Sequence, residues 1–244
     1  MSDEGAEDAE VPSRPEARAS LREVAFVTCG VTAATGLVID YAFDPARAGQ
    51  ASMLVALFVL YAALSALALV RLHRRGELRA RFRPVGGDMT LGALVALLLY
   101  GGARIFEMSV TPRGSPREAW IVRLYLQIGD PDAPGRGLAS AGVLCVAALE
   151  EIVWRGLVMR TLEDVVGPFR AAALTAVLFA IAHLPTLWLL RDPVAGLDPL
   201  VVVAALGCGL VWGLVAARAG RLVPALVAHA LFSWAVVDFP LWRP

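Results

Sequence analysis

The sequence contains no lysine, few charged residues and only three cysteines, and this composition excludes several classes of protein. Charged residues make up 18% of the chain and hydrophobic residues 58%, whereas soluble domains average about 25% charged and about 45–50% apolar residues. This balance excludes a disordered chain and an ordinary cytosolic enzyme. The formal net charge is zero, so no basic field favours a nucleic acid partner. The cysteines lie within apolar runs, which predicts small buried side chains rather than a disulfide or metal ligands; they are Cys29, Cys145 and Cys208.

The mean hydropathy of +0.65 predicts instead an all-α, polytopic membrane protein, because apolar residues can then face lipid as well as each other. Crossing about 30 Å of hydrocarbon takes about 20 largely apolar residues. Seven segments meet this requirement, so we expect a transmembrane helical bundle of about seven spans in the lipid bilayer. They are residues 24–43, 51–71, 88–107, 138–161, 169–190, 198–218 and 221–239.

Two polar regions set the predicted domain organisation and orientation. Residues 1–20 are polar and acidic, which predicts a disordered tail ahead of an integral membrane domain over residues 21–244. Six arginines lie between residues 71 and 83, and the positive-inside rule places such a loop in the cytoplasm. Arginine is the only strongly basic residue, which is typical of a GC-rich bacterial genome. We therefore expect a multi-pass protein of the bacterial cytoplasmic (inner) membrane.

The segment 115–128 is apolar on part of its surface but too short and too charged to be a regular span. We interpret it as an amphipathic interfacial or re-entrant helix. If this segment crossed the membrane, the chain would have eight spans and every later orientation would be reversed.

The fourth predicted span contains three charged residues, Glu150, Glu151 and Arg155, flanked by apolar residues on both sides. A charge at the centre of a membrane costs about 2.5–3.5 kcal/mol on insertion scales, so such residues are usually functional and paired. Glu151 and Arg155 are four residues apart, which predicts an ion pair on one helix face. Glu150 lies about 100° further around the helix and is left as the free carboxylate. The alternative is a single structural network of all three.

Two of the three histidines lie in later apolar spans, His183 four residues after Phe179 and His229 four residues before Ser233. The third, His73, belongs to the arginine-rich loop and is expected to be solvated. One histidine in an apolar helix is often only a hydrogen-bonded core residue. Two histidines and a glutamate from three helices could activate a water, either as base and oxyanion donors or as zinc ligands. Burial favours the neutral imidazole.

At this point three motifs resemble those of the CPBP intramembrane proteases (CAAX protease and bacteriocin-processing, Abi). Residues 150–155 match E-E-x-x-x-R, residues 179–183 match F-x-x-x-H, and residues 229–233 lie where the family has H-x-x-x-N. The order and spacing agree, and the resemblance covers a protease-like core over about residues 138–239. The first three spans match only in being hydrophobic.

The resemblance implies an intramembrane endopeptidase that cleaves near the C-terminus of a membrane-associated or tail-tagged protein. Glu150, with His183, would activate a water, and His229, helped by Ser233, would stabilise the oxyanion. Glu151 and Arg155 would hold the helix and orient Glu150. The family has been described both as metalloendopeptidases and as glutamate-dependent proteases. Zinc, if used, would be held by Glu150, His183 and His229; we favour the form without metal and expect no cofactor.

Serine at position 233 departs from the asparagine that is usual in the family. A hydroxyl donates one hydrogen bond but is shorter than an amide, so the departure concerns the oxyanion role rather than the base. The serine is interpreted as a mark of a subgroup. The arginine-only composition resembles that of the myxosortase-like members, which are thought to process C-terminal sorting tails of surface proteins in GC-rich bacteria.

Two other functions are compatible with the same residues. A proton-coupled transporter could use Glu150, His183 and His229 as a proton relay, although the first three spans carry few ionisable residues. A non-catalytic immunity or scaffold protein could keep the fold, although the presence of all three residues disfavours it.

Overall fold

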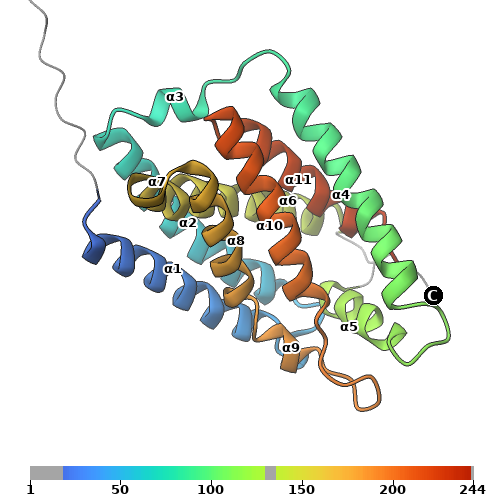
Figure 1. The fold of residues 1–244 in the computed structure, drawn as a ribbon. Helices are drawn as coiled ribbons and strands as arrows, with labels where there is room; N and C mark the ends of the chain where they lie inside the picture. The colour runs from blue at the N-terminus through green and yellow to red at the C-terminus, as the bar shows by residue number, and fades with distance from the viewer. Residues whose placement is uncertain (1–18, 130–135, 243–244) are drawn as a thin grey trace, which may run out of the picture.

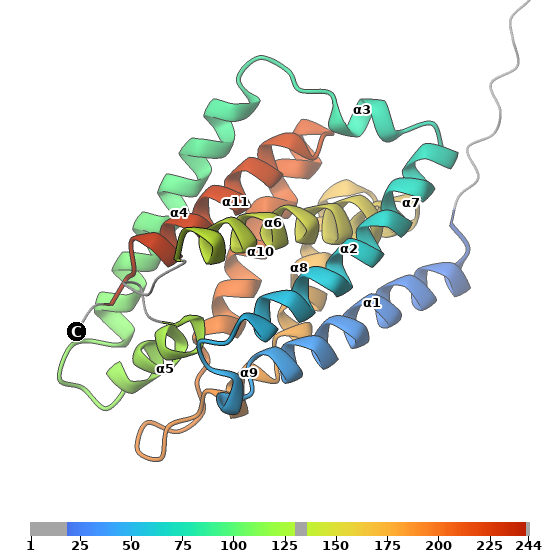
Figure 2. The same ribbon diagram turned by 180° about the vertical axis from the view of Figure 1, so that it is seen from behind.

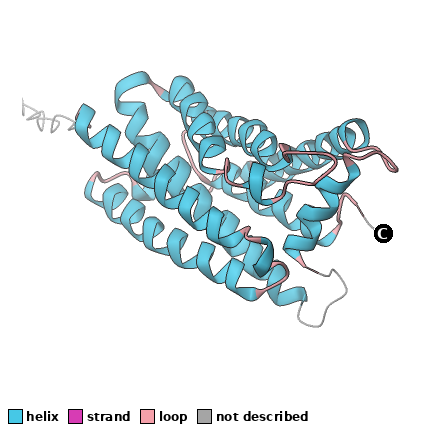
Figure 3. Cartoon of the chain, turned by 90° about the horizontal axis from the view of Figure 1, so that it is seen from below, coloured by secondary structure: helices cyan, strands magenta, loops and turns pink. Residues whose placement is uncertain are grey.

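The computed structural model describes residues 19–129 and 136–242, and helices make up almost all of this part (Figures 1 and 3). No strand occurs in these two ranges apart from one isolated bridge between Asp192 and Gly196. The helices are α1 (Leu21–Ala42), α2 (Ala51–Arg74), α3 (Leu78–Phe82), α4 (Asp88–Val110), α5 (Glu118–Ile128), α6 (Arg136–Val153), α7 (Arg160–Val166), α8 (Pro168–Ala182), α9 (Thr186–Leu189), α10 (Leu200–Ala219) and α11 (Val223–Asp238), with a 3₁₀ turn η1 (Pro45–Arg47) and a π-helix η2 (Trp154–Met159).

The predicted all-α bundle is confirmed, and each of the seven expected spans coincides with a helix. Six helical segments are long and apolar enough to cross a membrane, and one of them, Arg136–Val166, joins α6, η2 and α7. The seventh, α11, has 16 residues and is shorter than a regular span. Proline at its second position and the turn before it limit its length.

The seven segments run alternately between two ends of the bundle (Figures 1 and 2). At one end, which we call the arginine-rich end, the backbone N–H of Leu222 before α11 donates to the carbonyl of Arg81. At the opposite end, the side chain of Gln127 donates to the carbonyl of Ala42, which joins the end of α5 to the end of α1. Both ends of α5 therefore lie at the opposite end, and α5 does not cross the bundle.

The short helix α5 is amphipathic, as predicted. Trp120, Ile121 and Tyr125 are buried against Leu200 at the start of α10, whereas Leu126 is exposed. The hydroxyl of Tyr125 donates to the carbonyl of Val236 in α11. These contacts fix α5 across one end of the bundle.

The outer surface of the long helices is apolar. On α4, Leu97 and Leu98 are 66% and 74% exposed, and Phe26 on α1 is 81% exposed. Large side chains of this kind would be unstable in water over so wide a surface, and they are the side chains that lipid solvates. Together with the six long helices, this surface makes the chain a multi-pass membrane protein.

Small residues allow α10 to pack closely on α8. A Cβ atom at Gly213 would lie 3.1 Å from the Cβ of Ala172, and one at Gly209 would lie 3.1 Å from the ring of Phe179. Small residues four positions apart are a common device for bringing membrane helices together, because packing replaces the hydrophobic effect in lipid. The Gly209 carbonyl accepts a hydrogen bond from a side chain of η2, Arg155.

The arginines of the 71–83 region are partly paired with acidic residues from other helices. Arg75 lies 2.8 Å from Asp164, Arg81 lies 2.6 Å from Glu163, and Arg160 lies 2.6 Å from Glu77. Arg160 also pairs with Asp164. We call these six residues the end network. They tie the loop between α2 and α4 to the end of the Arg136–Val166 segment.

One sequence expectation, the burial of the cysteines, requires correction. Cys29 and Cys145 are free thiols on the outside of the bundle, not buried ones, because hydropathy alone does not separate a lipid-facing position from an interior one. Most of the predicted tail lies outside the described residues. Its last two residues belong to the helix entrance, since the Ser20 hydroxyl accepts from the N–H of Glu23 and caps α1.

Candidate active site

The candidate site is built around Glu150 and Glu151, near the middle of the Arg136–Val166 segment. The helix changes from α to π geometry directly after them, over Trp154–Met159. Every residue of this π-helix is buried. π-helical turns are rare and are found mostly at functional sites, because they displace a side chain from its regular helical direction.

Glu151 and Arg155 form the ion pair that their spacing predicts. Arg155 Nη1 donates to Glu151 Oε1 at 2.9 Å, and both side chains are completely buried. Arg155 Nη2 donates to the carbonyl of Gly209 at 2.6 Å, where α10 approaches most closely. Breaking a buried pair of this kind by removing one partner leaves an uncompensated charge, which costs about 3–5 kcal/mol.

His229 of α11 joins the two glutamates. Its Nδ1 lies 2.8 Å from Glu151 Oε1, and its Nε2 lies 3.6 Å from Glu150 Oε2. The indole of Trp212 stacks on the imidazole, with ring centroids 3.7 Å apart and an angle of 18° between the planes. The ring is therefore fixed in its plane by Trp212 and in its rotation by Glu151. We call Glu150, Glu151, Arg155 and His229 the buried cluster.

Glu150 is less enclosed than Glu151, since 12% of its side chain remains accessible, compared with none for Glu151. The hydroxyl of Tyr61, on α2, lies beside its carboxylate and interacts with it. The division predicted from the sequence, with Glu151 paired to Arg155 and Glu150 directed elsewhere, matches this arrangement. The direct contact between Glu151 and His229 was not predicted.

His183 ends α8 and is held by its own helix. Its Nδ1 lies 2.7 Å from the carbonyl of Phe179, so Nδ1 carries the proton in the neutral ring and Nε2 is free to accept. The ring also makes an edge contact with Phe179. Among the described residues, no hydrogen bond or ion pair joins His183 to Glu150 or His229, although it lies near enough to His229 to interact electrostatically.

Ser233 lies one turn beyond His229 on α11 and is partly buried. Within residues 19–129 and 136–242, its hydroxyl makes no hydrogen bond. The hydroxyl is therefore available to an incoming group, on the helix that also carries the imidazole.

The predicted zinc ligands do not form a metal-binding group in this structure. In the described part of the chain, no three or more histidine, cysteine, aspartate or glutamate side chains are arranged so that they could hold a metal ion. Glu150 and His229 face each other, but His183 is directed to its own helix by the Phe179 carbonyl.

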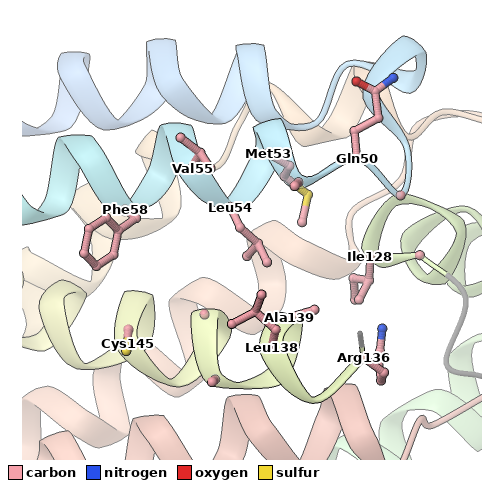
Figure 4. Close-up of a pocket in the computed structure, with 15 residues that line it drawn as sticks. Gln50, Met53, Leu54, Val55, Phe58, Ile128, Arg136, Leu138, Ala139 and Cys145 are labelled. Atoms are coloured by element: carbon pink, nitrogen blue, oxygen red, sulfur yellow. The ribbon is translucent and has the colours of Figure 1, made fainter. Parts of the chain in front are cut away.

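An apolar cavity of about 660 Å³ opens between α2 and α6, the helices that carry Tyr61 and Glu150 (Figure 4). Its walls carry Leu54 and Phe58 from α2 and Leu138 and Cys145 from α6. Gln50 and Arg136 lie at its outer edge. The last residues that line it, Phe58 on α2 and Cys145 on α6, precede Tyr61 and Glu150 by about one helical turn.

Two residues of the site were missed by reasoning from the sequence. Tyr61 and Trp212 lie in apolar spans whose charged residues stand only at the ends, and aromatic residues in apolar helices are usually core residues. The only indication in the sequence that Tyr61 could belong to the site was its polar hydroxyl in the middle of an apolar span. No sequence pattern pairs Trp212 with His229, because the two residues meet only through the packing of α10 on α11.

Fold and cluster together define a helical, multi-pass membrane protein with acid–base groups buried between its helices. Residues 136–235 match the family model for Rce1-like proteins, described as type II CAAX prenyl endopeptidase Rce1-like. The match confirms the resemblance to CPBP intramembrane proteases over this segment, which is less than half of the chain. No curated protein and no solved structure matches the chain.

Proposed function

We propose that the protein is an intramembrane endopeptidase in which Glu150 activates the attacking water. The observation that carries this proposal is the placement of Glu150 against His229, with Glu151 and Arg155 behind the imidazole. A general base needs a partner that fixes its geometry and receives or returns a proton, and the buried cluster supplies one.

His229 lies between two carboxylates: Glu151 accepts a hydrogen bond from Nδ1–H, and Nε2 faces Glu150. In the proposed reaction the ring carries a proton on each nitrogen. With Arg155, the cluster then holds two negative and two positive charges, which is the balance that buried charges require. This differs from the neutral imidazole that burial alone predicts.

In the proposed reaction, the Glu150 carboxylate takes a proton from water while the oxygen attacks the carbonyl carbon of the substrate. His229 Nε2–H and the Ser233 hydroxyl donate hydrogen bonds to the oxyanion that forms. Glu150 then returns the proton to the leaving nitrogen as the C–N bond breaks. The products are a carboxylate and an amine. No step is routed through a metal, and His183 is proposed to accept a hydrogen bond from the water through Nε2.

The substrate class that we propose is a membrane-associated protein cleaved near its C-terminus. The apolar cavity between α2 and α6 supports this class, because it can take an apolar segment from lipid beside the helix that carries Glu150. A prenylated terminus and an apolar sorting tail, as in a myxosortase-like member, share this chemistry.

We propose the cytoplasmic (inner) membrane of a bacterium as the location, with the arginine-rich end in the cytoplasm. Arginines outnumber acidic residues among the described positions at that end, whereas the two kinds are balanced at the opposite end. This asymmetry is what the positive-inside rule requires. The described arginines at the arginine-rich end are Arg22, Arg71, Arg74, Arg75, Arg79, Arg81, Arg83, Arg160, Arg170, Arg218 and Arg221.

The test uses purified full-length protein and an internally quenched peptide that ends in a farnesylated CAAX sequence. The same peptide without the farnesyl group and one ending in an apolar tail are assayed in parallel. We expect cleavage of at least one lipid-like substrate by the wild type and none by Glu150→Ala. In the cell, uncleaved C-termini should accumulate in membranes that contain Glu150→Ala. Identical C-termini in the two membranes, together with uncleaved peptides, would favour a non-catalytic protein.

A further inference from the structure

The first three spans contribute one face of α2 to the candidate site. Tyr61 and Ser65 are four residues apart and completely or almost completely buried. The Ser65 hydroxyl donates to the carbonyl of Leu149 at 3.1 Å, which fixes α2 against the turn of α6 that carries Glu150. Tyr61 therefore meets α6 one turn away, on the side of Glu150 and Trp154.

A hydrogen bond from Trp154 sets the direction of the Tyr61 hydroxyl. Trp154 Nε1 lies 3.4 Å from Tyr61 Oη, and both side chains are completely buried. An indole N–H can only donate, so Tyr61 Oη accepts this bond. Its own proton is then left for another acceptor. Because Glu150 and Trp154 are four residues apart, the carboxylate of Glu150 lies on the same side of the helix.

We propose that Tyr61 is a positioning residue for Glu150: its hydroxyl donates a hydrogen bond to the carboxylate and holds it facing His229. The chain of donors runs from the Trp154 indole through the Tyr61 hydroxyl to Glu150. The proposal rests on the proposed role of Glu150 as base. It extends the site beyond the matched segment 136–235 to α2.

The hydrogen bond would act by restricting the carboxylate to one rotamer. Glu150 retains some accessible surface, and its carboxylate lies 3.6 Å from His229 Nε2, which is longer than a good charge-assisted hydrogen bond. A second donor from α2 removes the freedom that this long contact leaves. A base that is held in place loses less entropy when it takes the proton from water.

The first test reads Glu150 directly and does not need a substrate. Infrared spectra of the full-length protein in lipid are recorded for the wild type and for Glu150→Gln, so that their difference identifies the carboxyl bands of Glu150. Tyr61→Phe keeps the ring and removes the hydroxyl. We expect these bands to move in Tyr61→Phe. The matched control is Tyr100→Phe, which loses a hydroxyl that donates to the Phe239 carbonyl on the other side of the bundle.

The second test measures cleavage of the quenched peptide by the same variants. In Tyr61→Phe we expect kcat to fall about 10- to 100-fold with KM little changed, because a hydrogen bond to a charged group is lost while the cavity is kept. Tyr100→Phe should behave as the wild type. Trp154→Phe should act in the same direction as Tyr61→Phe, and the double variant should be no slower than Tyr61→Phe alone, because both changes break one chain.

Each combination of results decides the proposal. Bands that move together with a fall in kcat support it. Unchanged bands overturn it, whatever happens to kcat, because Tyr61 then acts elsewhere. If the bands move but kcat is unchanged, Tyr61 contacts Glu150 without affecting the reaction, and its role as a positioning residue is overturned. If the wild type cleaves nothing, the proposed function has failed, and the bands alone decide the contact between Tyr61 and Glu150. If Tyr61→Phe does not accumulate, the infrared bands and the kcat of Trp154→Phe decide the proposal by the same criteria.

Discussion

The buried cluster and the end network use the same ionic groups in different surroundings. In the buried cluster, Glu151 and Arg155 are completely inaccessible and each keeps one polar atom, Glu151 Oε2 and Arg155 Nε, without a partner among the described residues. In the end network, the side chains of Glu77 and Arg160 are 24% and 14% exposed, and Arg160 pairs with three acids, Glu77, Glu163 and Asp164.

This difference decides what each set of charges contributes. A pair near the surface gains little, about 0–1 kcal/mol, because water screens it and can replace either partner. A fully buried pair offers no such replacement, so removing one member strands the other. The end network is therefore expected to tolerate substitution, whereas the buried cluster is expected to lose either stability or activity, depending on the residue.

The largest effect is expected from Glu150→Gln. Loss of the general base should lower the rate of peptide cleavage by about 10²- to 10⁴-fold. The amide is isosteric and Glu150 is not in the pair with Arg155, so the amount of folded protein and its melting temperature in detergent should remain near those of the wild type. Wild-type cleavage by Glu150→Gln would remove Glu150 from the mechanism.

The next largest effect is expected from Glu151→Gln, and it should appear first in stability. Arg155 would be left buried without a counter-charge, a loss of about 3–5 kcal/mol, measured as lower abundance and a lower melting temperature. The double variant Glu151→Gln/Arg155→Met should recover part of this stability, since no charge is then stranded. Because His229 Nδ1 loses its anionic partner, both variants should also be slow. Normal abundance of Glu151→Gln would show that the pair is not structural.

A smaller effect is expected at Ser233. Ser233→Ala should slow cleavage by about 10²-fold or less, since one strong oxyanion donor is worth about 10²–10³. Ser233→Asn should be tolerated because an amide also donates from this position. Wild type treated with a chelator is measured beside them. Full activity of Ser233→Ala together with complete, zinc-reversible inhibition by the chelator would contradict the proposed mechanism without metal.

The smallest effect is expected from Glu77→Gln in the end network. Burial tends to raise the pKa of Glu77, but the hydrogen bond from Arg160 and the charges of Arg160 and Arg81 outweigh it, so the pKa lies below its usual 4.5. A carboxyl with a lowered pKa stabilises the fold above pH 4.5, and this contribution is lost as the pH falls through the folded-state pKa. The variant should lose about 0.2–1 kcal/mol at neutral pH, and its melting temperature should fall less on acidification. An equal acid response in both proteins would contradict this role.

Much of the fold and part of the site could be predicted from the sequence. Hydropathy located every long helix, and the four-residue spacing of Glu151 and Arg155 predicted their ion pair. The contacts of His229 with Glu151 and of Tyr61 with Trp154 could not be predicted, because they depend on how separate helices rotate against each other. The same limit explains why the predicted burial of Cys29 and Cys145 was wrong, since hydropathy does not say which side of a span faces lipid.

The π-helix at Trp154–Met159 has a consequence for insertions and deletions in this chain. Relative to an α-helix, a π turn accommodates one additional residue, and one residue corresponds to about 100° of rotation. The glutamates before it and Arg160 after it keep their directions although the turn holds this additional residue: the glutamates face His229 and Arg160 faces Glu77. Deleting one residue within the turn would therefore let it relax to regular α geometry with both halves of the segment still directed at their partners. A deletion elsewhere in the segment would instead turn one half away from its partners by about 100°.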